Sequence, residues 1–159
     1  MKIGIFDSGM GGLSVLHRAL RMIPEADFLY YADEEHVPYG EKTREQVRGY
    51  IDEIIAFMIK KQVDAIVIAC NTATSAAAEE LRSQYPDRII IGIEPALKPA
   101  VTRFPGGKIL VMATDATLRE QKFAALLERY AHCCEIHKCP CPELVAFVDG
   151  KMLSALQNS

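Results

Sequence analysis

One cysteine of this chain stands where a strand is expected to pass into a helix. Cys70 ends an apolar run and is followed at once by the amide of Asn71 and the hydroxyl of Thr72. The pattern predicts a buried strand over Asp64–Ala69 and a helix over Ala73–Gln84. Ligands of open α/β sheets bind at this edge, and helix N-terminal N–H groups stabilise a thiolate or a carboxylate there. The spacing therefore indicates a reactive thiol, although many buried cysteines are only small hydrophobic residues.

A carboxylate and a hydroxyl end an earlier predicted strand. Asp7 and Ser8 follow the apolar segment Lys2–Phe6. In a parallel sheet they would share an edge with Cys70, and this set of groups suits a small zwitterion. Asp7 could bind an ammonium group or help deprotonate the thiol, while Ser8 and the polar residues after Cys70 could bind a carboxylate. The simpler interpretation is that Asp7 caps the following helix.

The glycine-rich turn after the first strand also allows a nucleotide-binding interpretation. Gly9-Met10-Gly11 follows a strand, and Asp33 ends the next one, where a ribose-binding acid would stand. The third small residue of that motif is replaced by Ser14, and the Asp7 carboxylate would repel a pyrophosphate. A Walker lysine is also missing, so this interpretation ranks last.

Residue types that bind zinc gather later in the chain: His132, Cys133, Cys134, His137, Cys139 and Cys141. Their spacing contains no CxxC pair, and adjacent cysteines of a strand point to opposite faces. We therefore expect no metal site, and a short edge strand with incidental thiols.

Strands and helices alternate along the chain. The predicted strands are Lys2–Phe6, Asp27–Ala32, Asp64–Ala69, Arg88–Ile93, Lys108–Ala113 and Cys134–His137. The predicted helices are Leu13–Met22, Ala73–Gln84, Leu118–Tyr130 and a helix that starts after Thr43, with Gln46 in a capping box. An interrupted helical pattern covers Leu144–Leu156. This order predicts an α/β fold with a parallel sheet flanked by helices on both faces over residues 1–97. An incomplete second α/β lobe is expected over residues 98–159, after a join rich in proline and glycine.

Composition limits the classes of protein that fit. The chain has 159 residues, of which 50% are hydrophobic and 25% charged, with a formal net charge of -3. This charge gives no reason to expect nucleic acid or an anionic membrane as a partner. We see no secretory signal and no apolar run long enough to span a membrane. Five cysteines without a signal favour reduced thiols and a cytoplasmic location.

Taken together, these segments closely resemble the glutamate racemases of the aspartate/glutamate racemase superfamily. The matching segments come in the family's order: Phe6–Leu13, Ala32-Asp33 with Pro38-Tyr39-Gly40, and Ala69–Thr74, with weaker matches at Glu94-Pro95, Ala113-Thr114 with Thr117, and Cys141–Val145. The resemblance covers nearly the whole of this chain.

The resemblance implies an isomerase that converts L-glutamate to D-glutamate by cofactor-independent two-base proton transfer, which supplies D-glutamate for peptidoglycan and so for cell-wall biogenesis and cell shape. By similarity, Cys70 is the first catalytic thiol. The substrate-binding residues implied in the same way are Asp7, Ser8, Tyr39, Gly40, Asn71, Thr72, Thr114 and Thr117. No cofactor or metal is implied. Glutamate is the expected partner, and homo-oligomer formation stays open.

Two departures from the family's pattern matter. The second catalytic cysteine of the family lies in a Gly-Cys-Thr-His segment, which does not occur here, and the chain resembles roughly the first three-fifths of the family's length. Ala116 also stands where the family usually has glycine. Two interpretations follow: a racemase chain with little or no racemase activity by itself, or an inactive truncated remnant that acts as a ligand-binding or interaction module. In both, we expect Cys70, at a helix N-terminus, to be alkylated faster than the other cysteines.

Overall fold

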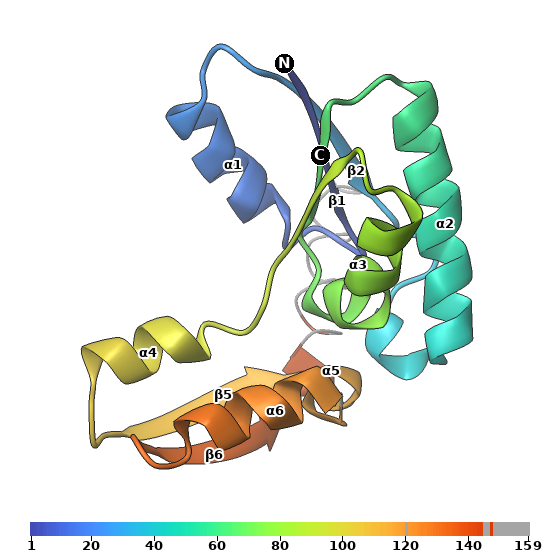
Figure 1. Cartoon of the computed structure of the whole chain (residues 1–159). Coiled ribbons are helices and arrows are strands. Elements are labelled where there is room, and N and C mark those ends of the chain that lie inside the picture. Colours follow the sequence, from blue (N-terminus) through green and yellow to red (C-terminus); the bar gives the residue numbers. More distant parts are fainter. Residues whose placement is uncertain (120, 145–146, 148–159) are drawn as a thin grey trace. The chain divides into compact units, whose positions relative to one another are not determined.

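The chain folds into two compact units, Met1–Ile93 and Glu94–Ser159 (Figure 1). The structure, a computed structural model, describes residues 1–119, 121–144 and 147. The sequence prediction placed the boundary after residue 97, whereas Leu97 begins the first helix of the second unit. Each unit has its own sheet and its own core, and each is described by itself.

The first unit is built on a parallel sheet of four strands in the order β2-β1-β3-β4. The strands are β1 (Lys2–Asp7), β2 (Asp27–Ala32), β3 (Ala65–Ile68) and β4 (Ile89–Gly92). β1 pairs in parallel with both β2 and β3, and Phe6 lies opposite Ile68. The predicted parallel sheet is therefore confirmed, and its central strands carry the apolar residues that the sequence indicated.

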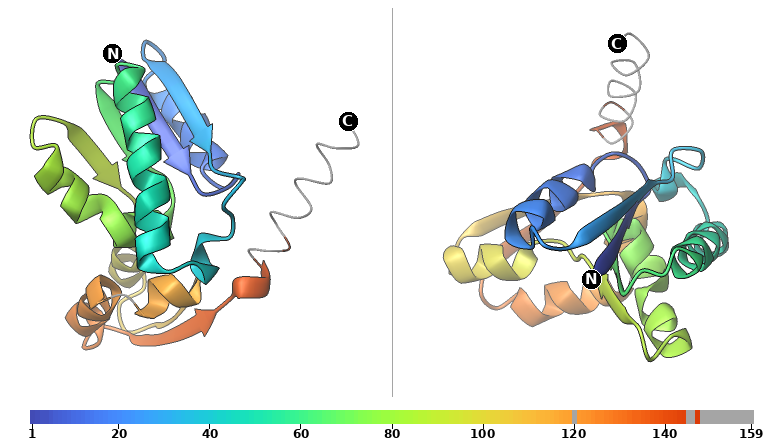
Figure 2. Two further views of the ribbon diagram at one scale, coloured as in Figure 1. Left: turned by 90° about the vertical axis from the view of Figure 1, so that its right-hand side faces the viewer. Right: turned by 90° about the horizontal axis from the view of Figure 1, so that it is seen from above.

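Helices cover both faces of this sheet. α1 (Leu13–Met22) packs on the face of Ile3 and Ile5. α2 (Arg44–Lys60) and α3 (Asn71–Gln84) pack on the other face, and the view from above in Figure 2 shows α1 and α2 on opposite sides of β1 and β2. A 3₁₀ turn, η1 (Tyr39–Glu41), precedes α2.

Local capping chemistry sets where α2 and α3 begin. The Thr43 hydroxyl accepts the Gln46 N–H at 3.2 Å, and the Gln46 side chain accepts the Thr43 N–H at 3.0 Å. This is the predicted capping box. α3 begins at Asn71 rather than at the predicted Ala73, because the Cys70 sulfur serves as its cap acceptor. Cysteine is not among the usual N-cap residues, so the sequence pattern missed this start.

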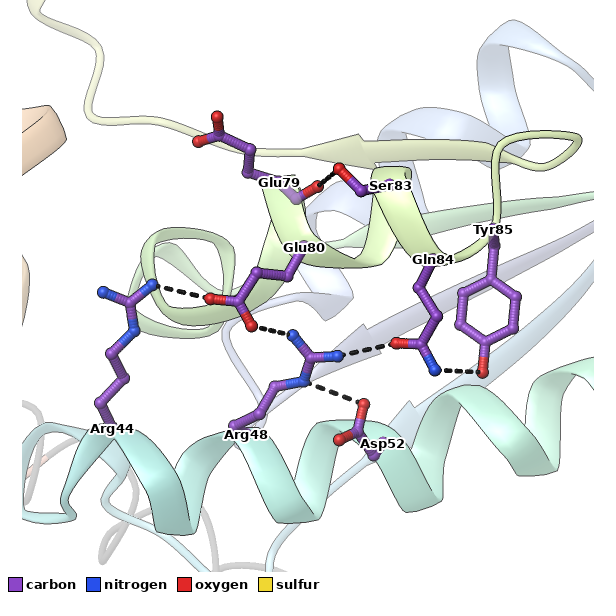
Figure 3. A network of polar contacts seen from close by, with 8 residues as sticks. All are labelled: Arg44, Arg48, Asp52, Glu79, Glu80, Ser83, Gln84 and Tyr85. Carbon is purple, nitrogen blue, oxygen red and sulfur yellow. Dashed lines mark hydrogen bonds and ion pairs between the residues drawn. The ribbon is translucent and has the colours of Figure 1, made fainter.

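A polar network links the outer surfaces of α2 and α3 (Figure 3). The Arg48 guanidinium donates to Asp52 at 3.0 Å, to Gln84 at 2.8 Å and to Glu80. Arg44 adds a second contact to Glu80 at 3.2 Å. Exposed ion pairs contribute little free energy individually. The buried apolar faces of the two helices therefore contribute more to the stability of the unit than this network does.

The second unit contains α4 (Leu97–Arg103), β5 (Lys108–Ala113), α5 (Asp115–Arg119), α6 (Gln121–Tyr130) and β6 (Glu135–Pro140). β5 and β6 pair in parallel. Apolar side chains of α4, β5, α5 and α6 form the core of this unit. Among the described residues, no helix is long and apolar enough to cross a membrane.

Two elements of the second unit differ from their predicted bounds. The predicted helix start at Leu118 is wrong, because α5 already begins at Asp115, where the Thr114 hydroxyl accepts the Thr117 N–H at 3.2 Å. β6 extends to Pro140 instead of ending at His137. The helical pattern over residues 144–156 falls almost entirely outside the described residues.

Two glycines provide a test of packing in the first unit. A Cβ on Gly92 would lie 2.5 Å from Thr74 Cγ2, and Thr74 is itself held by hydrogen bonds to the backbone of Ile68 and Ile93. We expect Gly92→Ala to lower the free energy of unfolding by about 1–3 kcal/mol. Gly49 lies in α2 with nothing near its Cβ position, so Gly49→Ala should raise it by about 0.5–1 kcal/mol. Urea denaturation measures both, and an unchanged Gly92→Ala midpoint would contradict the close contact.

Candidate functional site

The candidate site begins where β1 and β3 end. Ser8 lies two residues beyond Phe6, and Cys70 lies two residues beyond Ile68, its partner in the register. The ladder continues past β3, since the Ala69 N–H donates to the Phe6 carbonyl at 2.7 Å. Equal offsets from a paired position bring two side chains to the same edge and face of a sheet. Ser8 Oγ and Cys70 Sγ are accordingly 3.4 Å apart.

The Cys70 thiol is held in a dry environment. Only 7% of the residue is exposed, and its sulfur accepts the Ala73 N–H of α3 at 3.4 Å. Burial raises the pKa of the thiol, and the nearby charge of Asp7 adds to this rise. Hydrogen bonds from Ser8 and Ala73 act in the opposite direction but are the smaller effect. The expectation that the helix N-terminus favours a thiolate is therefore wrong for the free site, because desolvation outweighs the backbone amides of Ser8 and Ala73 and the Ser8 hydroxyl.

Asp7 has a structural partner as well as a place in the site. Its carboxylate accepts the N–H of Gly12, the residue before α1, at 2.8 Å. Gly12 itself is the N-cap of α1, so Asp7 is not the N-cap residue that the capping interpretation expected. The residue is 6% exposed, and burial raises the pKa of its carboxyl despite the surrounding backbone N–H groups of the turn. Asp7 thus closes the glycine-rich turn and places an acidic group near the thiol of Cys70.

A second polar group lies around Tyr39, which is 2% exposed and belongs to the same core cluster as Cys70. The Tyr39 hydroxyl donates to Asp33 at 2.5 Å, and burial raises its pKa, so it remains a donor. His36 contacts the other Asp33 oxygen at 2.8 Å and stacks on Tyr50 with ring centroids 3.8 Å apart. Each Asp33 oxygen therefore holds one side chain of this loop in place.

Asp33 and His36 are supporting residues whose roles the sequence analysis missed. The sequence offered Asp33 as a candidate ribose-binding acid and as part of the Ala32-Asp33 segment that resembles the family, but it assigned no contact between Asp33 and His36. The available signal was the three-residue spacing of an acid and a histidine just before Tyr39.

The remaining predicted site residues have more varied positions. Asn71 is exposed at the start of α3, and Thr72 beside it is buried. Gly40 lies in η1 next to Tyr39. Thr114 and Thr117 belong to the second unit, where their hydroxyl oxygens are 3.1 Å apart. Their places in a common substrate site remain predictions.

The histidines and cysteines of the second unit have other contacts. The Cys134 thiol is buried and donates to the Phe104 carbonyl at 3.2 Å, and His137 contacts Glu135 at 2.8 Å. Within residues 1–119, 121–144 and 147, no three histidine, cysteine or acidic side chains are grouped as a metal would require.

The environment of Cys70 leads us to predict the opposite order of thiol reactivity from the one that the sequence suggested. Because the thiol is buried and its pKa is raised, brief treatment with iodoacetamide should label the half-buried Cys133 and Cys139 before Cys70. Peptide mapping after quenching measures the order, and a guanidinium-unfolded sample, in which all five thiols should react alike, is the control. Preferential labelling of Cys70 in the folded chain would contradict the buried, protonated thiol.

Comparison with known proteins places these residues in a family. The family model for Asp/Glu/Hydantoin racemase matches residues 8–157. Glutamate racemase of Clostridium perfringens is 54% identical over 148 residues, which are 93% of this chain and 57% of that protein. Glutamate racemase of Clostridium novyi is 52% identical over 149 residues, which cover 94% of this chain and 58% of that protein. The chain thus spans less than two thirds of the length of these curated relatives.

Solved structures agree with this comparison. Escherichia coli glutamate racemase, in complex with L-glutamate and the activator UDP-MurNAc-ala, superposes with a TM-score of 0.86 at 30% identity, over 99% of this chain and 61% of that one. Glutamate racemase from Aquifex pyrophilus gives a TM-score of 0.77 at 38% identity, over 88% of this chain and 56% of that one. The fold, the strand-end cysteine and the family match lead to one conclusion: the chain belongs to the Asp/Glu/hydantoin racemase family.

Proposed function

We propose that this chain is part of a glutamate racemase that acts in the cytoplasm to supply D-glutamate for peptidoglycan, and that Cys70 is one of its two catalytic thiols. The observation that carries the proposal is the contact of 3.4 Å between Ser8 Oγ and Cys70 Sγ at the carboxyl edge of the first sheet. The similarity to curated glutamate racemases supports glutamate as the substrate.

The proposed chemistry is the transfer of the α-proton of glutamate. The Cys70 thiolate takes this proton, and the electron pair of the C–H bond stays on the α-carbon and its carboxylate. Racemisation then needs a second acid that protonates the opposite face of the α-carbon. The Gly-Cys-Thr-His segment, to which the resemblance assigns that acid, is not among these 159 residues. Cys70 therefore performs one half of the reaction.

The charges around Cys70 couple substrate binding to thiol activation. In the free site, burial and the Asp7 carboxyl both keep the thiol protonated. The ammonium group of glutamate, bound near Asp7, would offset the charge of that carboxylate and favour ionisation of the thiol. The thiolate would thus form when substrate is present, and its basicity would be retained because the site excludes water.

The other proposed substrate contacts follow from polarity and position. Ser8, Asn71 and Thr72 would orient a substrate carboxylate near the N-terminus of α3, where the helix dipole favours an anion. Asp33 and His36 would fix Tyr39 beside Gly40 at the same site. Thr114 and Thr117 would add hydroxyls from the second unit.

The first test is hydrogen exchange at the α-carbon. In heavy water, the chain should replace the α-proton of glutamate with deuterium, a step that needs one base, while circular dichroism detects little net inversion. Cys70→Ala should slow the exchange by at least about 100-fold, because one general base contributes that much or more. Cys133→Ala, in the second unit, should leave it unchanged. An intact fold without exchange would contradict the proposal and favour a non-catalytic ligand-binding chain.

The second test is the pH dependence of that exchange. At glutamate concentrations well below saturation, the exchange rate reports the free site, in which the pKa of the Cys70 thiol is raised. The reactive thiolate is then scarce at neutral pH, and the rate should rise about tenfold per pH unit up to that pKa. Ser8→Ala removes a hydrogen bond that lowers the pKa, so the profile should shift to higher pH. Deuterium incorporation measured by NMR across the pH range gives both profiles, and a shift to lower pH in Ser8→Ala would contradict the assigned role.

A further inference from the structure

A second pair of neighbouring sulfur atoms lies outside the Cys70 site, in the second unit. Cys139 Sγ and Cys141 Sγ are 3.6 Å apart. Both side chains are half-buried, whereas Cys70 and Cys134 are buried. Small reagents therefore reach this pair more readily than the thiol of the candidate racemase site.

The backbone of the sheet holds the two thiols together. Cys139 belongs to β6 and lies opposite Met112 of β5. Cys141 follows β6, and its N–H donates to the Ala113 carbonyl at 3.0 Å. Pro140, between them, has a backbone φ angle that its ring restricts. Because both cysteines are anchored to the same neighbouring strand, their proximity does not depend on a flexible loop.

We propose that Cys139 and Cys141 are a reversibly oxidisable dithiol that exchanges with low-molecular-weight disulfides and closes an intrachain disulfide bond. In the first step, the Cys139 thiolate attacks one sulfur of the disulfide RSSR. The S–S bond of the reagent breaks, and one RS⁻ leaves and takes up a proton. In the second step, Cys141 loses its proton and its sulfur attacks Cys139 Sγ, which displaces the second RS⁻. The protein loses two hydrogen atoms, and the reagent becomes two thiols.

The contact between the two thiols assigns their order of action. The hydrogen bond with Cys139 raises the pKa of the Cys141 thiol. The Cys141 thiol also donates to the Cys139 carbonyl at 3.4 Å, and both contacts favour its protonated form. We therefore assign the first attack to Cys139 and the resolving role to Cys141.

Geometry indicates that the disulfide bond is easily reduced. The sulfurs must approach from 3.6 Å to about 2.05 Å, and cysteines one residue apart close a small, strained ring. Strained disulfides have more oxidising potentials and are the labile ones. The strain would act on the Cys141 hydrogen bond to Ala113, directly before Thr114. A change in substrate binding on disulfide formation is expected only on the proposed function, in which Thr114 binds substrate. The formation of the disulfide bond itself does not depend on that function.

The test uses the chain treated with oxidised glutathione, quenched with iodoacetamide and cleaved with trypsin. Cleavage after Lys138 and Lys151 leaves Cys139 and Cys141 together in one peptide that contains no other cysteine. That peptide should be lighter by two hydrogen atoms and carry no alkyl group, and dithiothreitol should restore both alkylation sites. Full alkylation of both cysteines after oxidation would overturn the proposal.

Single variants separate the two roles. Cys141→Ser should trap glutathione on Cys139, because the resolving thiol is missing. Cys139→Ser should form the mixed disulfide at least about tenfold more slowly, because the first nucleophile is missing and the Cys141 thiol keeps its hydrogen bond to the backbone carbonyl of residue 139. Cys133→Ser, which removes another half-buried thiol, should leave the pair unchanged. A bond from either cysteine to Cys133 would contradict the assignment. None of these measurements depends on glutamate, so they are independent of the role of Cys70.

Discussion

The parallel register of β1 and β3 is the constraint on which the candidate site depends. Because Phe6 lies opposite Ile68, the residues two positions later, Ser8 and Cys70, reach the same edge of the sheet. A shift of one residue would turn Cys70 to the other face and break the hydrogen bond between Ala69 and Phe6. The apolar residues of both strands resist that shift, since it would move buried side chains out of the two cores that flank the sheet. Core packing and site geometry are therefore fixed by the same pairing.

Burial determines the chemistry at this edge as much as proximity does. Asp7 and Cys70 are both removed from water, and both lose some preference for their charged forms. The backbone N–H groups of the glycine-rich turn partly offset the desolvation of Asp7, while two backbone amides and the Ser8 hydroxyl partly offset that of Cys70. The free site consequently keeps the Cys70 thiol protonated beside the Asp7 carboxyl. In a site of this kind, a bound cation has a large effect on its neighbours, because little solvent screens it.

In the second unit, the end of a strand also positions two side chains that can react, Cys139 and Cys141. Cys139 lies in β6 and Cys141 directly follows it, and both are anchored to β5, whereas Ser8 and Cys70 follow two different strands. The two sites also differ in exposure. Cys139 and Cys141 are half-buried, so they are open to reagents that Cys70 excludes. Two thiol environments with different accessibility thus exist in one chain, each defined by the end of a parallel strand pair.

The sequence by itself determined the alternation of strands and helices, the parallel sheet, the capping box at Thr43 and the position of Cys70 between a strand and a helix. These features follow from apolar periodicity and from hydrogen bonds between residues a few positions apart, so local sequence specifies them. Only the tertiary structure decided that Tyr39 and His36 share Asp33, that the Cys70 pKa is raised rather than lowered, and that Cys139 touches Cys141. Each of these depends on side-chain direction, on burial or on the distance between separate segments. Desolvation in particular is set by every group packed around an atom, and no short stretch of sequence contains that information.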